Sequence, residues 1–418
     1  MTTDANNSSG GFDQQDQHVD RQTNVAGNFS DNRTYNYFQA TPSNLRRSFD
    51  AYMDGKLQYF VGRQFVFDAL DDFIKKNPSG YFIIRAAPGM GKSSLLSKLI
   101  RDRGYIHHFN ISPQNIRSAR AFLENVCAQL IARYNLPQKQ LPSNAGDDSG
   151  FLMECISEAA KDSKNHPIVL AVDSLDEADR TGLAPGVNSL YLPPSLPRGV
   201  FVVLTTRPLD DMHLQVSPQK QFDIEATSEI NSKDIEAYTS EFIARQAKMR
   251  EWLEQRKDKI SREQFIAGIR MKSQGNFMYL QHVLPAIAEG RFTFGKQDIL
   301  AELPDGLKGY YQRHWREMQE GKKENFEEVY AKIVCILGVA QEPVTVDQIA
   351  SWTKLTSFKI KESIGEWREF LIEEESKSSK RLQIYHRSFQ DFLKEQVDLT
   401  QFHDMISDYY LSRSQAAV

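Results

Sequence analysis

The sequence has few cysteines, no long apolar run and no secretory signal pattern. Its three cysteines, Cys127, Cys155 and Cys335, are scattered over 418 residues. An odd, scattered set is typical of buried thiols in a reducing compartment and excludes a disulfide framework or a cysteine zinc site. The longest apolar runs, such as 168–172 and 200–204, are far shorter than the about 18 residues of a membrane span. No basic segment followed by an apolar stretch begins the chain, so we expect a cytoplasmic protein.

The chain also lacks an excess of charge of either sign. Lysine and arginine number 51, aspartate and glutamate 55, and the net charge is −4. Without a basic field, binding to nucleic acid or to a membrane surface is not expected. The hydrophobic fraction of 40% and charged fraction of 25% exclude a wholly disordered or fibrous chain. At about 100–200 residues per domain, the length allows two or three domains.

Leucine and isoleucine are absent from the first 44 residues, where asparagine, glutamine, serine, glycine, threonine and aspartate supply 26 of the first 40. Such a segment buries too little apolar surface to offset its ordering entropy, so residues 1–57 are predicted to form a disordered polar tail. Residues 24–30 mix asparagine and glycine with β-forming residues. This pattern can also stack as a cross-β ladder, and a self-templating signalling motif is therefore kept as an alternative.

Short apolar segments alternate with helical periodicity from about residue 58 onward. The expected strands are 81–85, 105–111, 168–173, 200–205 and 221–224, and the expected helices 93–101, 119–133 and 151–161. Nearly all-apolar strands alternating with helices are typical of a parallel sheet covered on both faces. The sequence therefore predicts a three-layer α/β domain over residues 58–225.

Two further regions are predicted after residue 225. Helical spacing at 233–250, 263–272 and 276–287 indicates a helical lid domain over 226–303. In the region 304–418, helices precede two short apolar segments, 370–374 and 382–386, on either side of a polar tip. Helices followed by a two-stranded wing favour a winged-helix domain.

A glycine-rich turn after the first strand gives the strongest functional signal. Residues 85–94 read Arg-Ala-Ala-Pro-Gly-Met-Gly-Lys-Ser-Ser, the P-loop pattern with Ala86 in place of the usual first glycine. Backbone N–H groups at the start of the following helix favour phosphate. Lys92 is expected to reach the β- and γ-phosphates, and the Ser93 hydroxyl to bind Mg²⁺. The predicted phosphate-binding residues are Pro88, Gly89, Met90, Gly91, Lys92, Ser93 and Ser94.

Polar residues follow two later strands. Asp173 ends one of them and suits the Mg²⁺ water shell, and Asp176 and Glu177 follow it, where a water would attack the γ-phosphate. Arg207 follows the next strand and is expected to contact the terminal phosphate through its planar fork. Loop solvation for the acids and a surface arginine before a proline turn are the alternative interpretations. No Asn-Lys-x-Asp guanine motif occurs, which favours ATP over GTP.

The motifs and their order resemble the nucleotide-binding core of the STAND signalling ATPases, the NACHT and NB-ARC relatives, over about residues 58–395. The runs 173–177 and 205–208 are similar to the second motif and the sensor of the NACHT form. Phe60-Val61-Gly62-Arg63 resembles the motif that meets adenine, which implies nucleotide contacts for Val61, Gly62 and Arg63.

Two more segments carry this resemblance in the C-terminal half. Residues 274–277 resemble the Gly-x-Pro element of the lid, with Phe277 in place of proline. Residues 385–389 are similar to the winged-helix motif whose histidine, here His386, contacts the β-phosphate of ADP.

The resemblance implies an ATP/ADP switch with slow, Mg²⁺-dependent hydrolysis that is closed with ADP and forms a homo-oligomer with ATP, in immune or stress signalling. Such relatives usually carry a repeat array after the winged helix, whereas this sequence stops at Val418. One alternative is a winged-helix DNA-binding regulator, but residues 351–393 hold 8 basic and 7 acidic residues and lack the basic footprint of a DNA reader. Another is a P-loop ATPase that drives transport or remodelling.

Overall fold

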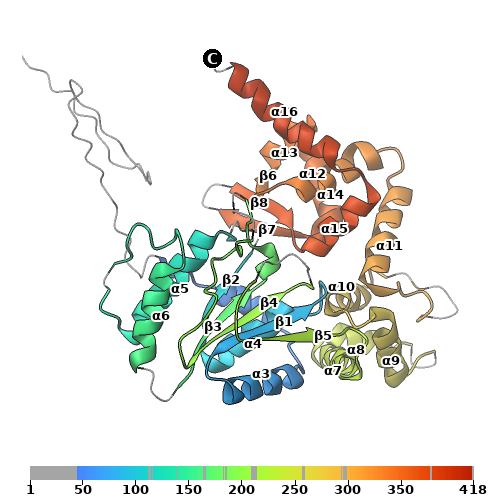
Figure 1. Cartoon of the computed structure of the whole chain (residues 1–418). Coiled ribbons are helices and arrows are strands. Elements are labelled where there is room, and N and C mark those ends of the chain that lie inside the picture. Colours follow the sequence, from blue (N-terminus) through green and yellow to red (C-terminus); the bar gives the residue numbers. More distant parts are fainter. Residues whose placement is uncertain are drawn as a thin grey trace, which may run out of the picture.

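The computed structural model describes residues 45–416 apart from 112–113, 115, 139, 163–165, 182, 184–185, 209–213, 257–258, 293, 295–298 and 377–378. The predicted motif at residues 24–30 lies outside this range. Figure 1 shows an α/β region with a helical region beside it and a C-terminal region above. Among the described helices, none combines the length and apolarity that a membrane crossing requires.

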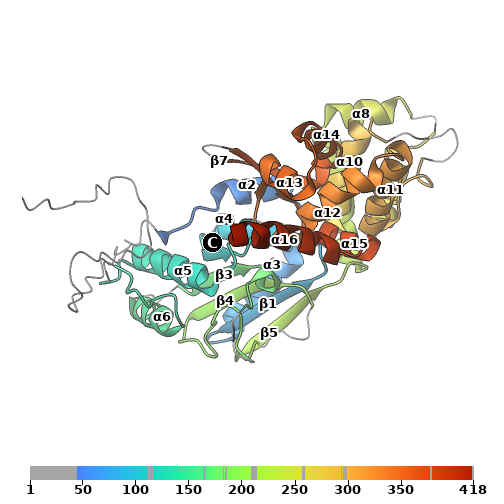
Figure 2. The same cartoon turned by 90° about the horizontal axis from the view of Figure 1, so that it is seen from above.

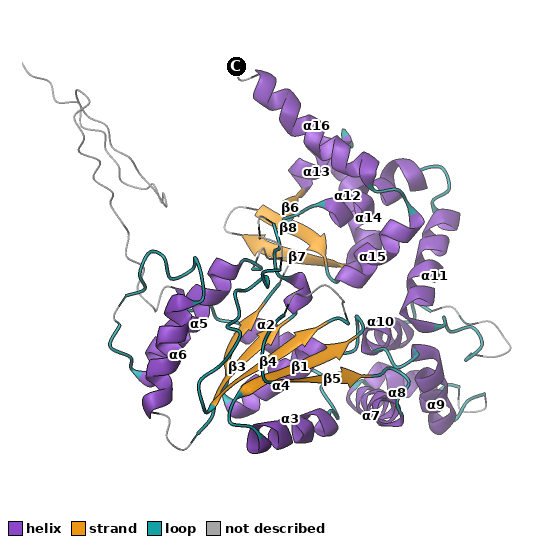
Figure 3. Cartoon of the chain, viewed as in Figure 1, coloured by secondary structure: helices purple, strands orange, loops and turns teal. Residues whose placement is uncertain are grey.

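The α/β region is built on a five-stranded parallel sheet, as predicted (Figure 3). Its spatial order is β2-β3-β4-β1-β5, so the strands that precede Asp173 and Arg207 are neighbours. β3 and β4 are buried along their whole length, which explains their continuous apolar sequence. The strands are β1 (Gly80–Ala86), β2 (Ile106–Phe109), β3 (Ile168–Asp173), β4 (Val200–Thr206) and β5 (Gln219–Ile224).

Helices cover both faces of this sheet. Alternate residues of β1 divide between the two faces: Tyr81 and Ile83 join one core, and Phe82 and Ile84 the other. This arrangement confirms the three-layer prediction. The first core contains α5 (Ala119–Tyr134) and α6 (Gly150–Asp162), and the second contains α2 (Asp50–Leu57), α3 (Gln64–Lys76) and α4 (Lys92–Arg103).

α2 lies within the stretch 1–57 that composition predicts to be disordered. The helix packs against α4 and β2 because Phe49 and Met53 are buried there. The Phe49 ring lies 5.2 Å from the ring of Phe109 in β2. Two apolar side chains in a polar stretch therefore suffice when their partners, distant in sequence, supply the rest of the core.

The described residues of the helical region form four helices in place of the three predicted. They are α7 (Glu229–Arg245), α8 (Ala247–Glu254), α9 (Arg262–Ser273) and α10 (Phe277–Ala288). The predicted helix 233–250 is interrupted at Gln246, whose backbone is extended with φ −97° and ψ 107°. The Gln246 side chain donates to the Tyr59 hydroxyl. Because Tyr59 is distant in the sequence, the periodicity of residues 233–250 could not predict this break in the helix.

The C-terminal region has a winged-helix arrangement. Its three-stranded antiparallel sheet has the order β6-β8-β7; β6 precedes two of the helices, and β7 and β8 follow them. The predicted second strand ends at Ile384, before His386, which caps the next helix. In Figures 1 and 2 the α7–α11 side lies opposite α5 and α6. The elements are α11 (Gly306–Gly321), a π-helical turn (Phe326–Ala331), α12 (Lys332–Val339), β6 (Val344–Thr345), α13 (Val346–Thr353), α14 (Ser357–Trp367), β7 (Leu371–Ser376), β8 (Ser379–Ile384), α15 (Arg387–Gln396) and α16 (Thr400–Ala416).

Candidate functional site

The predicted P-loop connects β1 to α4, as the motif requires. Gly89 and Gly91 have φ values of 79° and 81°, a conformation that favours glycine. Gly91 is the N-terminal cap of α4 and has no capping side chain, so first-turn N–H groups remain available at the loop. A Cβ at Gly89 would overlap the Asn276 side chain of the helical region. Both the positive φ and this close approach therefore require glycine here.

Lys92 is the first residue of α4 and is buried, with 9% of its surface exposed. Its Nζ donates to the carbonyl oxygens of Ala86 at 2.8 Å and Ala87 at 3.2 Å. Burial lowers the pKa of this ammonium group, and nearby Asp176 and Asp173 oppose the shift. The lysine is therefore held in place by neutral oxygens at the point where the P-loop prediction expects phosphate.

Asp173 and Ser93 form the predicted metal position. Asp173 is fully buried at the end of β3 and accepts from the hydroxyls of Thr205 and Ser174. Burial raises the pKa of this carboxyl, while the hydroxyls, including that of Ser93, and the charge of Lys92 lower it. A carboxylate beside a P-loop hydroxyl is the oxygen donor set that suits Mg²⁺ held through water and phosphate. The residues present fit the predicted metal.

Two of the three proposed catalytic residues, Asp176 and Arg207, contact each other. Asp176 and Glu177 lie in a short turn after β3. The Arg207 Nε lies 3.0 Å from Asp176 Oδ2, and its Nη1 lies 2.9 Å from Oδ2 of Asp391 in α15. In this arrangement the Asp176 carboxylate is occupied by Arg207, and Arg207 links the α/β region to the C-terminal region. Glu177 lines the cavity described below.

Arg63 contacts the helical region and the P-loop at once. Its backbone N–H donates to Asp234 Oδ2 at 3.1 Å, and its guanidinium donates to Asn231 Oδ1 at 2.8 Å and to the Met90 carbonyl at 2.7 Å. The same group lies 4.6 Å from the centre of the Phe277 ring. Burial lowers its pKa to about 10, so it stays charged at neutral pH. The Arg63 side chain therefore contacts the P-loop, and Arg63 also lines the cavity described below, so the nucleotide contact implied by the resemblance stays a prediction.

Val61, one of the two neighbouring predicted residues, lies beside an aromatic wall formed by Tyr238 and Phe277. Val61 borders the cavity together with Tyr238 and Phe277, whose rings meet edge to face at 5.8 Å. Gly62 has φ 72°, and a Cβ there would overlap the Asp234 side chain. Flat aromatic surfaces beside a phosphate cradle can stack a purine base.

The N-terminus of α10 contacts the P-loop. Asn276 caps the helix by accepting from Met278 N–H at 3.0 Å, and its Nδ2 donates to the Pro88 carbonyl at 3.0 Å. The Phe277 N–H donates to the Gly89 carbonyl at 3.0 Å. A proline at position 277 would lack this N–H. The departure from the Gly-x-Pro pattern thus supplies a backbone contact between helical region and P-loop.

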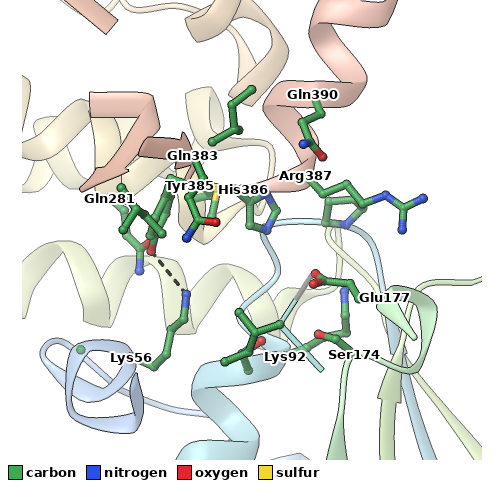
Figure 4. A pocket seen from close by; sticks show the side chains of 18 of the residues that line it. Lys56, Lys92, Ser174, Glu177, Gln281, Gln383, Tyr385, His386, Arg387 and Gln390 are labelled. Carbon is green, nitrogen blue, oxygen red and sulfur yellow. Dashed lines mark hydrogen bonds between the residues drawn. The ribbon is translucent and has the colours of Figure 1, made fainter. Parts of the chain in front are cut away.

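His386 caps α15 and lines the cavity opposite the P-loop (Figure 4). Its Nδ1 accepts from the Ser388 N–H at 3.1 Å. Since a backbone N–H only donates, a neutral ring carries its proton on Nε2. Burial, together with the charges of Lys56, Arg207 and Lys92, holds the pKa of His386 well below its usual range. The imidazole is thus neutral at physiological pH and has one N–H to donate.

These residues surround a cavity of about 1240 Å³ between the α/β, helical and C-terminal regions. Sequence reasoning missed several residues that line it, above all Tyr52 and Lys56 of α2, since they fell in the predicted tail. It assigned no site role to Tyr385 and Arg387 of the 385–389 motif, which also line the cavity. The Arg387 Nη1 donates to the Asp176 carbonyl at 3.1 Å. This hydrogen bond and the Arg207–Asp391 ion pair hold the C-terminal region over the α/β region.

Comparisons with known proteins found distant likenesses. No family profile matches the sequence, and no curated protein matches it. A STAND ATPase with a tetratricopeptide repeat sensor from Pyrococcus horikoshii is similar over 85% of this chain and 45% of its own, with 16% identity and a TM-score of 0.44. Two RuvB mutants from Thermotoga maritima are similar over 80% and 83% of this chain and 96% and 97% of theirs, with 11% and 10% identity and TM-scores of 0.30 and 0.29. This chain spans less than half the length of the STAND protein.

Proposed function

We propose that this chain is an ATP/ADP-switched signalling ATPase of the STAND, NACHT-like class, acting in immune or stress signalling in the cytoplasm. The observation that carries the proposal is the cavity, which has Lys92 and Ser93 of the P-loop on one side and His386 of the C-terminal region on the other. A nucleotide in such a cavity would contact the P-loop and the C-terminal region together.

Different residues of the cavity bind the phosphates, the metal ion and the adenine. The N-terminus of α4 and Lys92 hold the β- and γ-phosphates, because fixed N–H groups and one ammonium face the same place. Ser93 and Asp173 hold Mg²⁺, which supplies charge neutralisation when bound. Val61 and the aromatic wall take the adenine. Arg63 and Gly62 keep the helical region against the P-loop.

Hydrolysis is slow in this arrangement for a physical reason. Asp176 or Glu177 would orient the attacking water, and Arg207 would contact the terminal phosphate. The pair formed by Asp176 and Arg207, with side chains only 3% and 15% exposed, must first open. Asp391 shares Arg207, so opening also releases the C-terminal region. Chemistry and domain release are thereby coupled.

His386 distinguishes ADP from ATP. Its Nε2–H donates to a β-phosphate oxygen, and a γ-phosphate would crowd that contact. ATP therefore favours the open arrangement, whose newly exposed surface binds a second copy of the chain. Differential contact of this kind is what moves an equilibrium between two states.

Size-exclusion chromatography with light scattering tests this proposal in ADP and in a slowly hydrolysed ATP analogue. We expect a monomer with ADP and a larger assembly with the analogue. Lys92→Ala is expected to stay monomeric in both. Absence of nucleotide binding by the parent chain in calorimetry would contradict the proposal outright.

A further inference from the structure

α2 carries a lysine into the cavity from outside the P-loop motif. Lys56 Nζ donates to the Tyr385 hydroxyl at 3.4 Å and lies 5.0 Å from the centre of the Tyr385 ring and 5.2 Å from that of Tyr52. No carboxylate of the described residues forms an ion pair with it at 4.0 Å or less. A long hydrogen bond and two ring faces are weak compensation for an ammonium group in a partly closed cavity.

The position of Lys56 is fixed by the packing of α2. The Tyr52 ring, one helical turn earlier, lies 5.1 Å from Phe109 of β2, and Met53 is buried against the same layer. Arg101 of α4 adds ion pairs to the exposed face of α2. Lys56 is therefore held toward the cavity before any ligand is bound, which lowers the entropy cost of a contact.

Three positively charged side chains, Lys56, Lys92 and Arg207, line this cavity. Lys56, Arg207 and Lys92 all act on the His386 ring and lower its pKa. Arg207 has carboxylate partners, whereas Lys92 and Lys56 contact neutral oxygens. Figure 4 shows Lys56 and Lys92 on one side and Tyr385 and His386 on the other. An anion between them would satisfy both ammonium groups.

We propose that Lys56 is a second phosphate-binding lysine of this site, provided by α2. The proposal rests on the proposed function, namely that the cavity holds a nucleotide. A nucleotide bound by both lysines contacts α2 as well as α4. Phosphate binding therefore stabilises α2 through Lys56, so the stability of this helix depends on the bound nucleotide.

Calorimetry on the full chain tests the assignment with two probes, ADP and adenosine. Lys56→Met keeps the aliphatic stem and is expected to weaken ADP binding about 10- to 100-fold, the range for a hydrogen bond to a charged group. Adenosine has no phosphate, so its affinity should change less than about twofold. Lys56→Arg should retain most of the ADP affinity. Lys98→Met on α4, a lysine paired with Asp102 away from the cavity, is the matched control and should bind like the parent.

A purely structural role for Lys56 gives different results. If the lysine only held Tyr385, Tyr385→Phe would weaken ADP binding as much as Lys56→Met, and the melting temperature without nucleotide would fall. We expect instead that Tyr385→Phe binds ADP nearly as the parent does and that Lys56→Met without nucleotide is no less stable than the parent. ADP should also slow hydrogen exchange at residues 50–57 in the parent but not in Lys56→Met.

The two proposals fail in distinguishable ways. Parent-like ADP affinity in Lys56→Met, or an equal loss for ADP and adenosine, would overturn the role of Lys56 and leave the proposed function standing. A parent chain without ADP binding, or unchanged ADP affinity in Lys92→Ala, would overturn the proposed function itself.

Discussion

At the scale of single residues, the charged side chains at and beneath the P-loop are positioned by protein oxygen atoms. Carbonyl groups hold Lys92, and hydroxyl groups hold Asp173. The contribution of each such side chain to nucleotide binding can therefore be measured with a single substitution.

Lys92→Ala is expected to weaken ADP and ATP binding by at least about 100-fold, because the phosphates lose their main point charge. Its melting temperature should stay close to that of the parent or rise slightly, since a buried ammonium group is removed. Calorimetry and thermal unfolding measure the two effects. Lys98→Ala, on the same helix, serves as control. A folded Lys92→Ala variant with parent affinity would refute the P-loop assignment.

His282 gives a prediction on pH. Its ring stacks on Tyr310 at 5.4 Å, and burial lowers its pKa to about 4, against the raising effect of Glu369. A histidine with a depressed folded-state pKa costs stability as pH falls below its unfolded value of about 6.5. His282→Phe keeps the stacked ring, and its free energy of unfolding should therefore fall less between pH 7.5 and pH 4.5, by about 2–3 kcal/mol.

Urea unfolding at the two pH values measures this difference. The exposed His403→Phe variant is the control and should lose stability with acid as the parent does. An acid loss in His282→Phe equal to that of the parent would show that His282 is not held neutral by burial.

At the scale of elements, the sequence predicted what local pattern determines. The P-loop turn, the apolar strands and the strand pair of the wing all follow from residues close in the chain. α2 and the break at Gln246 depend on partners far away, Phe109 and Tyr59, and no window of sequence contains them. The Arg207–Asp391 pair joins residues 184 positions apart and was missed for the same reason.

Asn276 connects two elements, and its two roles can be separated. Asn276→Ala loses both the cap of α10 and the bond to Pro88, and should cost about 1–2 kcal/mol of stability while speeding nucleotide release. Asn276→Asp keeps an N-cap acceptor but cannot donate to the Pro88 carbonyl. It should retain the stability and release nucleotide faster than the parent. Thermal unfolding and stopped-flow release measure the two effects, and parent-like release in both variants would contradict a link from cap to P-loop.

At the scale of the whole molecule, polar contacts close the C-terminal region over the α/β region. They include the Arg207–Asp391 pair and the bond from Arg387 to the Asp176 carbonyl. The helical and C-terminal regions share one continuous apolar core, whereas the α/β region has cores of its own. Opening at the cavity therefore breaks mainly ion pairs and hydrogen bonds and leaves the two cores of the α/β region intact. An equilibrium of this kind responds to a single ligand contact.

His386 is the residue at which that response should be largest. His386→Ala removes the Nε2 donor and the cap of α15, and His386→Asn removes the donor but retains a capping side chain. A hydrogen bond to a charged group contributes about 1.5–3 kcal/mol, so both variants should release ADP about 10- to 100-fold faster and assemble more readily. Only His386→Ala should also lose thermal stability without nucleotide. If His386→Asn held ADP as long as the parent while His386→Ala did not, the histidine would act as a helix cap alone and nucleotide sensing would have to lie in the Arg207–Asp391 pair.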